Sequence, residues 1–138
     1  MPFFHDTELD CVFGEFQLSN DYSGAPNFVH GGITLALADE AMAWACIACG
    51  HQWAVTTETS TRFLGAVYVG KAYRIEARIV DRNETTMTTQ AQVVDPKGRI
   101  RVESRATFTT LGEAQAARAV GDRSGSIPGD YLRSGGSD

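Results

Sequence analysis

The chain is poor in cysteine, proline and positive charge, which limits the classes of protein it can belong to. It contains three cysteines and four prolines in 138 residues. A small, odd number of cysteines argues against a disulfide framework. Residues 1–6 show no signal-peptide pattern, so we expect a reduced, cytoplasmic setting. The 12 basic residues are outnumbered by 17 acidic ones, a net charge of −5, which argues against nucleic-acid binding as the main task.

No apolar stretch is uninterrupted enough to predict a membrane partner. The longest, residues 33–49, contains Asp39 and Glu40, and acids in its middle make it a poor membrane span. A chain of this length predicts one domain with its own core, and we assign residues 1–111 to it. Residues 112–138 are rich in Gly, Ser, Asp and Arg without a period, so we expect a mobile polar tail there.

A long helix is predicted over residues 31–49. Ala, Leu, Met and Glu dominate this stretch, and all are good helix formers. Its second half is apolar on nearly every side, which predicts burial, and Gly50 is a typical helix terminator. Before the helix, residues 19–29 are dense in turn-forming residues. Residues 7–18 read as one strand in which Gly14 marks a bulge.

The second half of the chain changes to a period of two. Apolar and polar side chains alternate there, as in strands with one buried face, and a Thr-rich strand precedes them. Turn-forming residues at 81–84 and 95–98 indicate two hairpins. One antiparallel sheet curled around one apolar helix, an α+β fold, satisfies this order. The four predicted strands are residues 55–63, 73–79, 87–93 and 100–108.

The start of the predicted helix is the most informative stretch of the chain. His30, Gly31 and Gly32 form a turn motif, and Asp39 and Glu40 then interrupt the apolar run. Acids in the middle of a hydrophobic helix are costly to bury. Chemistry is the leading explanation for them, and the alternative is a structural acid capped by backbone donors. This stretch is therefore the candidate active site.

These residues resemble the hotdog-fold acyl-CoA thioesterases, most closely the phenylacetate-pathway (PaaI-like) and Them-type branch. The resemblance rests on Val-His-Gly-Gly at residues 29–32 and Asp-Glu-Ala-Met at residues 39–42. In that group a His-Gly-Gly turn begins the central helix, and a carboxylate lies nine positions after the histidine, where this chain has Asp39. The resemblance covers about residues 10–110. It implies a hotdog fold, an antiparallel β-sheet wrapped around one long central helix.

A second phrase resembles the family strand that places a Ser or Thr hydroxyl in the site. It is Ala-Val-Thr-Thr-Glu at residues 54–58, followed after three residues by Arg-Phe-Leu at residues 62–64. Thr56 is the matching position, with Thr57 as the alternative if the register differs by one. The chain also departs from the family pattern, since residues 65–67 lack a frequent proline and Gly24 replaces the Asn or Gln of some branches.

The resemblance implies thioester hydrolysis, which needs a polarised carbonyl, an oxyanion donor and a base or nucleophile. We expect Gly31 N–H to be the donor, because a residue without Cβ lets the thioester oxygen approach closely. Asp39 then acts as nucleophile or general base, with Glu40 as the alternative carboxylate. His30 orients the turn, and Thr56 positions water or the carboxylate. The predicted substrate-binding residues are Gly32, Phe28, Thr57, Glu40, Arg62 and Phe63.

Helix geometry indicates that the site is shared between two copies of the chain. His30 and Asp39 are nine residues apart, so they point to opposite sides of the helix with a rise of about 13–14 Å. A common site requires the turn of one copy and the carboxylate of another, in a two-fold dimer with antiparallel helices. The family arrangement implies the same. We expect a homodimer that pairs again into a tetramer.

Other motifs are weaker. Cys46 and Cys49 lie on one helix face near His51, but no second cysteine pair exists. We interpret both as buried thiols and expect neither a metal nor a cofactor. Trp44 and Trp53 read as core or interface residues.

The expected partner is an acyl-CoA or acyl-carrier-protein thioester. The basic residues Arg62, Lys71 and Arg74 are candidates for the phosphates of coenzyme A, and a solvated strand face explains them equally well. Two other functions stay open at this point. One is a hotdog hydratase or dehydratase with histidine as base, and the other is a non-catalytic acyl-thioester binder. The carboxylate nine positions after His30 favours hydrolysis.

Overall fold

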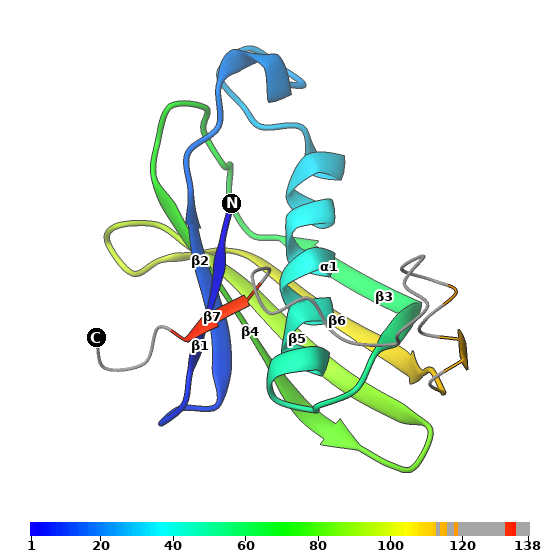
Figure 1. Cartoon of the computed structure of the whole chain (residues 1–138). Helices are drawn as coiled ribbons and strands as arrows, with labels where there is room; N and C mark the ends of the chain where they lie inside the picture. Colours follow the sequence, from blue (N-terminus) through cyan, green and yellow to red (C-terminus); the bar gives the residue numbers. More distant parts are fainter. Residues whose placement is uncertain (113, 116–117, 119–131, 135–138) are drawn as a thin grey trace.

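The computed structural model describes all residues except 113, 116–117, 119–131 and 135–138. In this part of the chain, one long helix, α1 (Gly31–Ala48), lies against a seven-stranded sheet (Figure 1). The strand order is β3-β6-β5-β4-β2-β1-β7. The strands are β1 (Phe3–Asp6), β2 (Cys11–Phe16), β3 (Ala54–Phe63), β4 (Tyr73–Arg82), β5 (Thr86–Val94), β6 (Ile100–Thr110) and β7 (Leu132–Ser134), and a 3-10 turn, η1, spans Asn20–Tyr22.

The expected α+β architecture is confirmed. Strands β1 to β6 pair antiparallel with one another, and α1 contacts each of them, so the sheet covers one side of the helix. The period of two in β5 is borne out, since Met87, Thr89, Ala91 and Val93 are buried and their neighbours are not. Their side chains meet α1 in the core. This arrangement is the hotdog fold that the sequence predicts.

The helix α1 begins and ends within one residue of its predicted bounds.

By length and composition alone α1 could cross a membrane, a property that the core helix of a soluble protein shares. Here one side packs on the sheet, and its small alanines allow close contact. At the C-terminal end, Gly50 is required by space, because a Cβ there would lie 2.5 Å from Met87 Sδ. The buried residues of α1 are Thr34, Ala38, Ala41, Met42, Ala45, Cys46, Ile47 and Ala48.

The strand predicted over residues 7–18 is present but shorter, since only residues 11–16 of that range form a strand, β2, and residues 7–10 form a turn. The chain forms two antiparallel strands, β1 and β2, because Asp6 Oδ1 accepts the N–H groups of Glu8 and Leu9 and closes a turn between them. The side-chain period is mixed because this turn occupies the first four residues of the predicted strand. The expected bulge at Gly14 is also absent, and β2 pairs with β4 in unbroken register there. Gly14 instead makes room for the N-terminal residues, since a Cβ would lie 3.1 Å from Pro2 O.

Two turns and one terminal strand complete the fold. The predicted hairpin at 95–98 is present, and the other turn lies at 83–85, one or two residues later than expected. Strand β7, within the region expected to be a tail, pairs in parallel with β1. Most of residues 112–138 lies outside the described residues, so the mobile tail stays a prediction.

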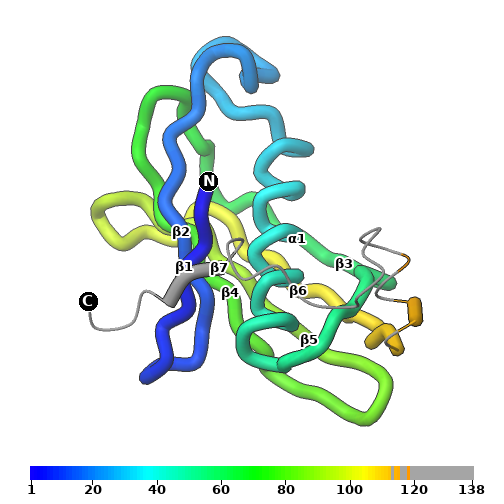
Figure 2. The backbone as a smooth tube through the Cα atoms, in the orientation of Figure 1, coloured from blue at the N-terminus to red at the C-terminus, as the bar shows by residue number. Residues whose placement is uncertain are grey.

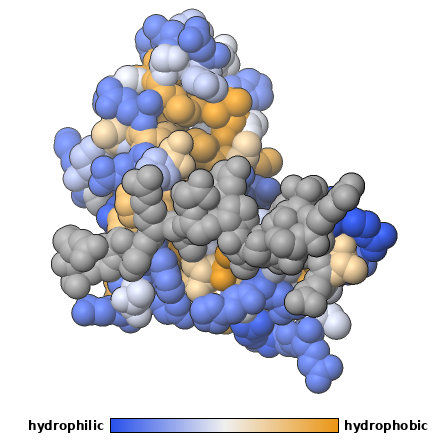
Figure 3. Space-filling view, viewed as in Figure 1, coloured by the Kyte–Doolittle hydropathy of each residue, from blue (hydrophilic) through white to orange (hydrophobic). Residues whose placement is uncertain are grey.

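Two surfaces of the described chain are open. Strand β3 is an edge of the sheet, ten residues long, and eight of those residues are exposed. Apolar side chains also gather around the N-terminal half of α1 on the side away from the sheet (Figure 3), where Ile33, Ala36 and Leu37 line a shallow groove. Long free edges and apolar patches of this kind are usually covered in the functional assembly.

Candidate active site

The start of α1 is held in place by a distant segment of the chain. Residues 64–72, after β3, run beside the loop that leads into the helix (Figure 2). Val29 N–H donates to Val67 O at 2.8 Å, and Val69 N–H donates to Asn27 O at 3.0 Å. The ring of Phe28 packs on that of Tyr68, with centroids 5.3 Å apart. These contacts fix where the first turn of α1 points.

One backbone donor at the helix N-terminus is left without an acceptor. His30 is the N-cap, and its Nδ1 accepts the N–H of Gly32 at 2.9 Å. The carbonyl of His30 accepts the N–H groups of Ile33 and Thr34. Of the first four N–H groups of α1, all within the described residues, only that of Gly31 has no recorded acceptor. It therefore offers a hydrogen bond, reinforced by the helix dipole, to an incoming oxygen atom.

A mostly apolar groove lies beside Gly31. A Cβ at Gly31 would lie 3.5 Å from Phe63 Cζ, so the glycine keeps the backbone close to the groove. Phe28 and Phe63, both predicted to bind substrate, are exposed at its sides. An apolar groove with one unpaired N–H suits a carbonyl carried on an apolar chain. The groove is lined by Phe28, Val29, Gly31, Thr34, Phe63, Gly65, Ala66 and Val67.

Asp39 lies further along α1 and is held by Thr56 of β3. Thr56 Oγ1 donates to Asp39 Oδ1 at 2.6 Å, a short charge-assisted hydrogen bond. Asp39 is half-buried and Thr56 is exposed. The carboxylate is therefore oriented from one side while it stays accessible, which a nucleophile or a general base requires.

A β-bulge selects the hydroxyl that meets Asp39. The register between β3 and β6 shifts between Thr56 and Glu58. Thr56 lies opposite Phe108, which faces the core, whereas Thr57 Oγ1 donates to Thr107 O at 3.2 Å. The structure thus brings Thr56, and not the alternative Thr57, to the carboxylate.

The remaining predicted residues lie away from this pair. Gly32 shapes the cap through its hydrogen bond to His30. Glu40 is exposed, and its Oε1 accepts Trp44 Nε1–H at 3.2 Å, one helical turn away. Arg62 lies on the exposed edge strand opposite Glu103. None of these three contacts is with Asp39.

The unpaired N–H of Gly31 and the carboxylate of Asp39 stay apart within one chain. Gly31 is the first residue of α1 and Asp39 the ninth, which gives a rise of about 12 Å along the helix. One carbonyl group cannot contact both. The chain therefore presents two candidate half-sites, the Gly31 N–H and the Asp39 carboxylate.

The cysteines take no part in either half-site. Burial raises the pKa of the Cys46 thiol to about 12, and burial likewise raises that of Cys49 to about 12. Cys49 lies near the His5–Asp10 pair, which is 3.0 Å long, and the three ligand atoms are within 4.8 Å of one another. This group lies at the C-terminal end of α1, opposite the His-Gly-Gly turn. The expectation of no metal stays a prediction.

Sequence reasoning missed the residues that complete the groove. Gly65, Ala66 and Val67 line it only because the segment after β3 returns to the start of α1. The one feature of the sequence that could have identified them is their position directly after Arg62-Phe63-Leu64, where the family pattern often has a proline. Thr34 carried no signal, since it follows the motif inside an apolar run.

Several solved structures share this fold. The protein smu.793 from Streptococcus mutans UA159, bound to acetyl CoA, is 21% identical, with a TM-score of 0.73 over 80% of this chain and 88% of that one. The E. coli PaaI protein of the phenylacetic acid degradation operon is 20% identical, with a TM-score of 0.69 over 75% and 74%. A hypothetical thioesterase of Streptococcus pneumoniae TIGR4, solved with an Asp→Ala substitution, is 20% identical, with a TM-score of 0.70 over 74% and 84%. The same protein was also solved with a Thr→Ala substitution.

The family follows from the sequence match and not from these distant structures. At such low identity the structures show the fold, which the predicted PaaI-like branch shares. No curated protein matches the chain. A family model described as the thioesterase superfamily matches residues 26–102, more than half of the chain, including the His-Gly-Gly turn, Asp39 and Thr56. The chain belongs to the thioesterase superfamily.

Proposed function

We propose that this protein hydrolyses an acyl-CoA thioester at a site built from two copies of the chain. Gly31 N–H of one copy stabilises the oxyanion, and Asp39 of the other acts as nucleophile or general base. The single observation that carries the proposal is the pair of half-sites on one helix, an unpaired N–H at its first residue and an oriented carboxylate at its ninth.

The oxyanion half supplies electrostatic stabilisation. When the thioester carbonyl is attacked, negative charge develops on its oxygen, and the Gly31 N–H lies at the positive end of the α1 dipole. His30 keeps that donor available, because its side chain and carbonyl satisfy the next three N–H groups. A single preorganised donor of this kind is typically worth about 3–4 kcal/mol of activation free energy.

The carboxylate half supplies the attack. Asp39 either adds to the carbonyl carbon, giving an acyl-enzyme anhydride that water then cleaves, or removes a proton from an attacking water molecule. In both routes the C–S bond breaks; in the base route the proton taken from water passes to the leaving thiolate, and in the nucleophile route the thiolate takes a proton from solvent water before a second water cleaves the anhydride. Thr56 holds one carboxylate oxygen, so the other is available for reaction. The Asp→Ala and Thr→Ala variants of the pneumococcal relative involve the same two residue types.

The exposed edge of β3 and the apolar side of α1 are best explained if a second copy of the chain covers them. Strand β3 carries Thr56 and ends at Phe63, and its free edge is long enough to pair with β3 of another copy. Antiparallel pairing of two such strands would bring the start of one strand beside the end of the other. Thr56 and Asp39 of one copy would then lie near Phe63 and Gly31 of its partner. The apolar outer side of α1 offers a further surface for a tetramer.

Thiol release from a panel of acyl-CoAs tests the activity. The wild-type protein is expected to release free thiol, and Asp39→Ala is expected to lose this activity while Asp81→Ala, at an exposed position near the end of β4, keeps it. Release that survives Asp39→Ala removes Asp39 from the mechanism. Binding of acyl-CoA without release from any acyl-CoA or acyl-carrier thioester would instead favour the non-catalytic binder. Addition or loss of water without thiol release would favour the hydratase.

Subunit mixing tests the shared site. Asp39→Ala and Gly31→Val are each expected to be inactive, because the first removes the carboxylate and the second places a bulky side chain in the groove beside the Gly31 N–H. In a re-equilibrated equal mixture, half of the dimers contain one intact site, so about a quarter of the wild-type activity returns. No recovery, with mixed dimers verified by mass spectrometry, would show that each site lies within one chain.

A further inference from the structure

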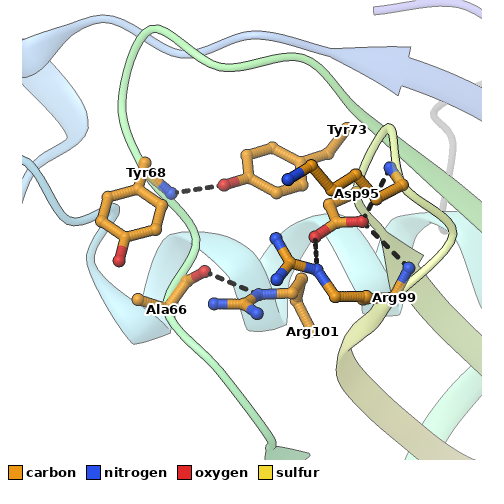
Figure 4. A network of polar contacts seen from close by, with 7 residues as sticks. Ala66, Tyr68, Tyr73, Asp95, Arg99 and Arg101 are labelled. Carbon is orange, nitrogen blue, oxygen red and sulfur yellow. Dashed lines mark hydrogen bonds and ion pairs between the residues drawn. The ribbon is translucent and has the colours of Figure 1, made fainter.

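A basic cleft opens on the other side of the segment that borders the acyl groove. Its walls are residues 66–73 and the turn between β5 and β6 at 95–99 (Figure 4). Four cations, Lys71, Lys97, Arg99 and Arg101, line it together with one acid, Asp95. The whole chain has 12 basic and 17 acidic residues. One third of its positive charge therefore gathers at one place on an acidic protein.

The single acid in the basic cleft is already engaged. Asp95 Oδ1 accepts the backbone N–H groups of Lys97 and Arg99, and Asp95 Oδ2 accepts Arg99 Nε–H at 2.7 Å (Figure 4). These bonds hold the turn in shape and neutralise Arg99. Lys71, Lys97 and Arg101 have no carboxylate partner among the described residues, so the cleft keeps a positive charge that attracts anions.

Arg101 joins the basic cleft to the acyl groove. Its Nε–H donates to the carbonyl of Ala66 at 3.1 Å, and Ala66 itself lines the groove beside Gly31. A Cβ at Gly65 would lie 2.5 Å from Arg101 Cζ, so the guanidinium lies directly on the backbone that borders the groove. A ligand that passes over Gly65 and Ala66 therefore reaches the cations as it leaves the groove.

The wall that contains Lys71 also contributes two aromatic rings, those of Tyr68 and Tyr73. Tyr68 N–H donates to Tyr73 Oη at 2.8 Å, which fixes the loop against β4 (Figure 4). The Lys71 ammonium lies 4.7 Å from the centroid of the Tyr68 ring. The ring of Tyr68 in turn packs on Phe28 at the side of the acyl groove. Lys71 is thus oriented over the path between groove and cleft.

We propose that the basic cleft binds the phosphate groups of the coenzyme A nucleotide while the acyl group occupies the groove beside Gly31. The inference rests on the proposed function for its choice of anion. A nucleotide that carries a pyrophosphate and a 3′-phosphate is a compact polyanion, which suits a concave cleft between two loops. An acidic carrier protein would need a broad basic face, whereas these four cations line one concave cleft. Of the three cations that the sequence suggested for this role, only Lys71 lies in it, and Arg74 is bound to Glu76 at 2.6 Å.

Calorimetric binding of free coenzyme A tests the basic cleft without any hydrolysis. The wild-type protein is expected to bind coenzyme A more tightly than 3′-dephospho-coenzyme A, and pantetheine most weakly, with an affinity for coenzyme A that falls as salt rises. Lys71→Ala/Lys97→Ala is expected to weaken coenzyme A binding about tenfold and to leave pantetheine binding unchanged. Arg78→Ala, which removes an exposed cation from β4 outside the cleft, is the matched control.

The outcomes separate failure of the cleft from failure of the activity. Equal affinity of the double variant and the control for coenzyme A would overturn the cleft proposal, even if the protein cleaves acyl-CoA. Cleft-dependent binding of coenzyme A without cleavage of any thioester would support the cleft and remove the proposed activity. Tight, Lys71- and Lys97-dependent binding of an acyl-carrier protein, with coenzyme A binding unaffected, would overturn the proposal in favour of a protein-bound substrate.

Discussion

Replacing Thr56 with valine removes a single hydroxyl from the proposed site and keeps the β-branched shape of the side chain. The hydroxyl donates to Asp39 Oδ1 at 2.6 Å. Without it, the carboxylate loses its only recorded partner within the described chain and is free to rotate. We expect Thr56→Val to lower kcat because the reacting oxygen is then less often aimed at the carbonyl carbon.

The size of the effect follows from the strength of the bond. Hydrogen bonds to charged groups contribute about 1.5–3 kcal/mol, and each 1.36 kcal/mol is a factor of about ten in rate. Thr56 is exposed in the single chain, where water competes for the carboxylate. We therefore expect the lower end of this range, a loss of about tenfold in kcat.

Steady-state thiol release with acyl-CoA measures the change, and two variants make it specific. Thr56→Ser keeps the hydroxyl and is expected to stay within about threefold of wild type. Thr88→Val makes the same chemical change on the outer side of β5 and is expected to have no effect. A kcat for Thr56→Val within twofold of wild type would refute the positioning role. If Thr56→Ser loses as much activity as Thr56→Val, the methyl packing and not the hydrogen bond is what matters.

Three further variants or conditions test other parts of the structure. Gly31→Ala meets only ordinary contacts, so we expect wild-type thermal stability together with a loss of kcat/KM as the methyl group enters the groove. Gly50→Ala places a Cβ 2.6 Å from the Cys46 carbonyl, and we expect a loss of about 1–3 kcal/mol in the free energy of unfolding, seen as a lower Tm. Because burial raises the pKa of Cys46 and Cys49 from 9.0 to about 12, the unfolded chain loses protons that the folded state keeps above pH 9. Stability in urea titrations should therefore fall as pH rises from about 9 toward 12, and iodoacetamide should modify both thiols slowly until the protein unfolds.

Local patterns in the sequence predicted the elements that depend on local physics. The period of two in β4, β5 and β6 and the apolar run of α1 report which side of each element is buried. The sequence also predicted that Asp39 and Thr56 belong to one site, but this prediction came from the resemblance to a family and not from their spacing. The β1–β2 turn was missed because one carboxylate, that of Asp6, decides it.

Contacts between distant segments were beyond sequence reasoning. Nothing near Arg101 in the sequence indicates that its guanidinium lies on Gly65, thirty-six positions earlier. Of the four cations in the basic cleft, the sequence suggested only Lys71, because they come from two loops and one strand. The net charge of the chain predicts repulsion of anions, and only the fold reveals a local exception.

The β-bulge in β3 also determines which charges lie near Asp39. In an unbroken strand, successive side chains alternate between the two sides of the sheet. Glu58 would then share the inner side with Thr56, and a second carboxylate would lie next to Asp39. The extra residue moves Glu58 to the outer side, opposite Thr107 and beside Arg105 in a shallow groove. One inserted residue thus keeps a like charge away from the reacting group without changing the position of Thr56.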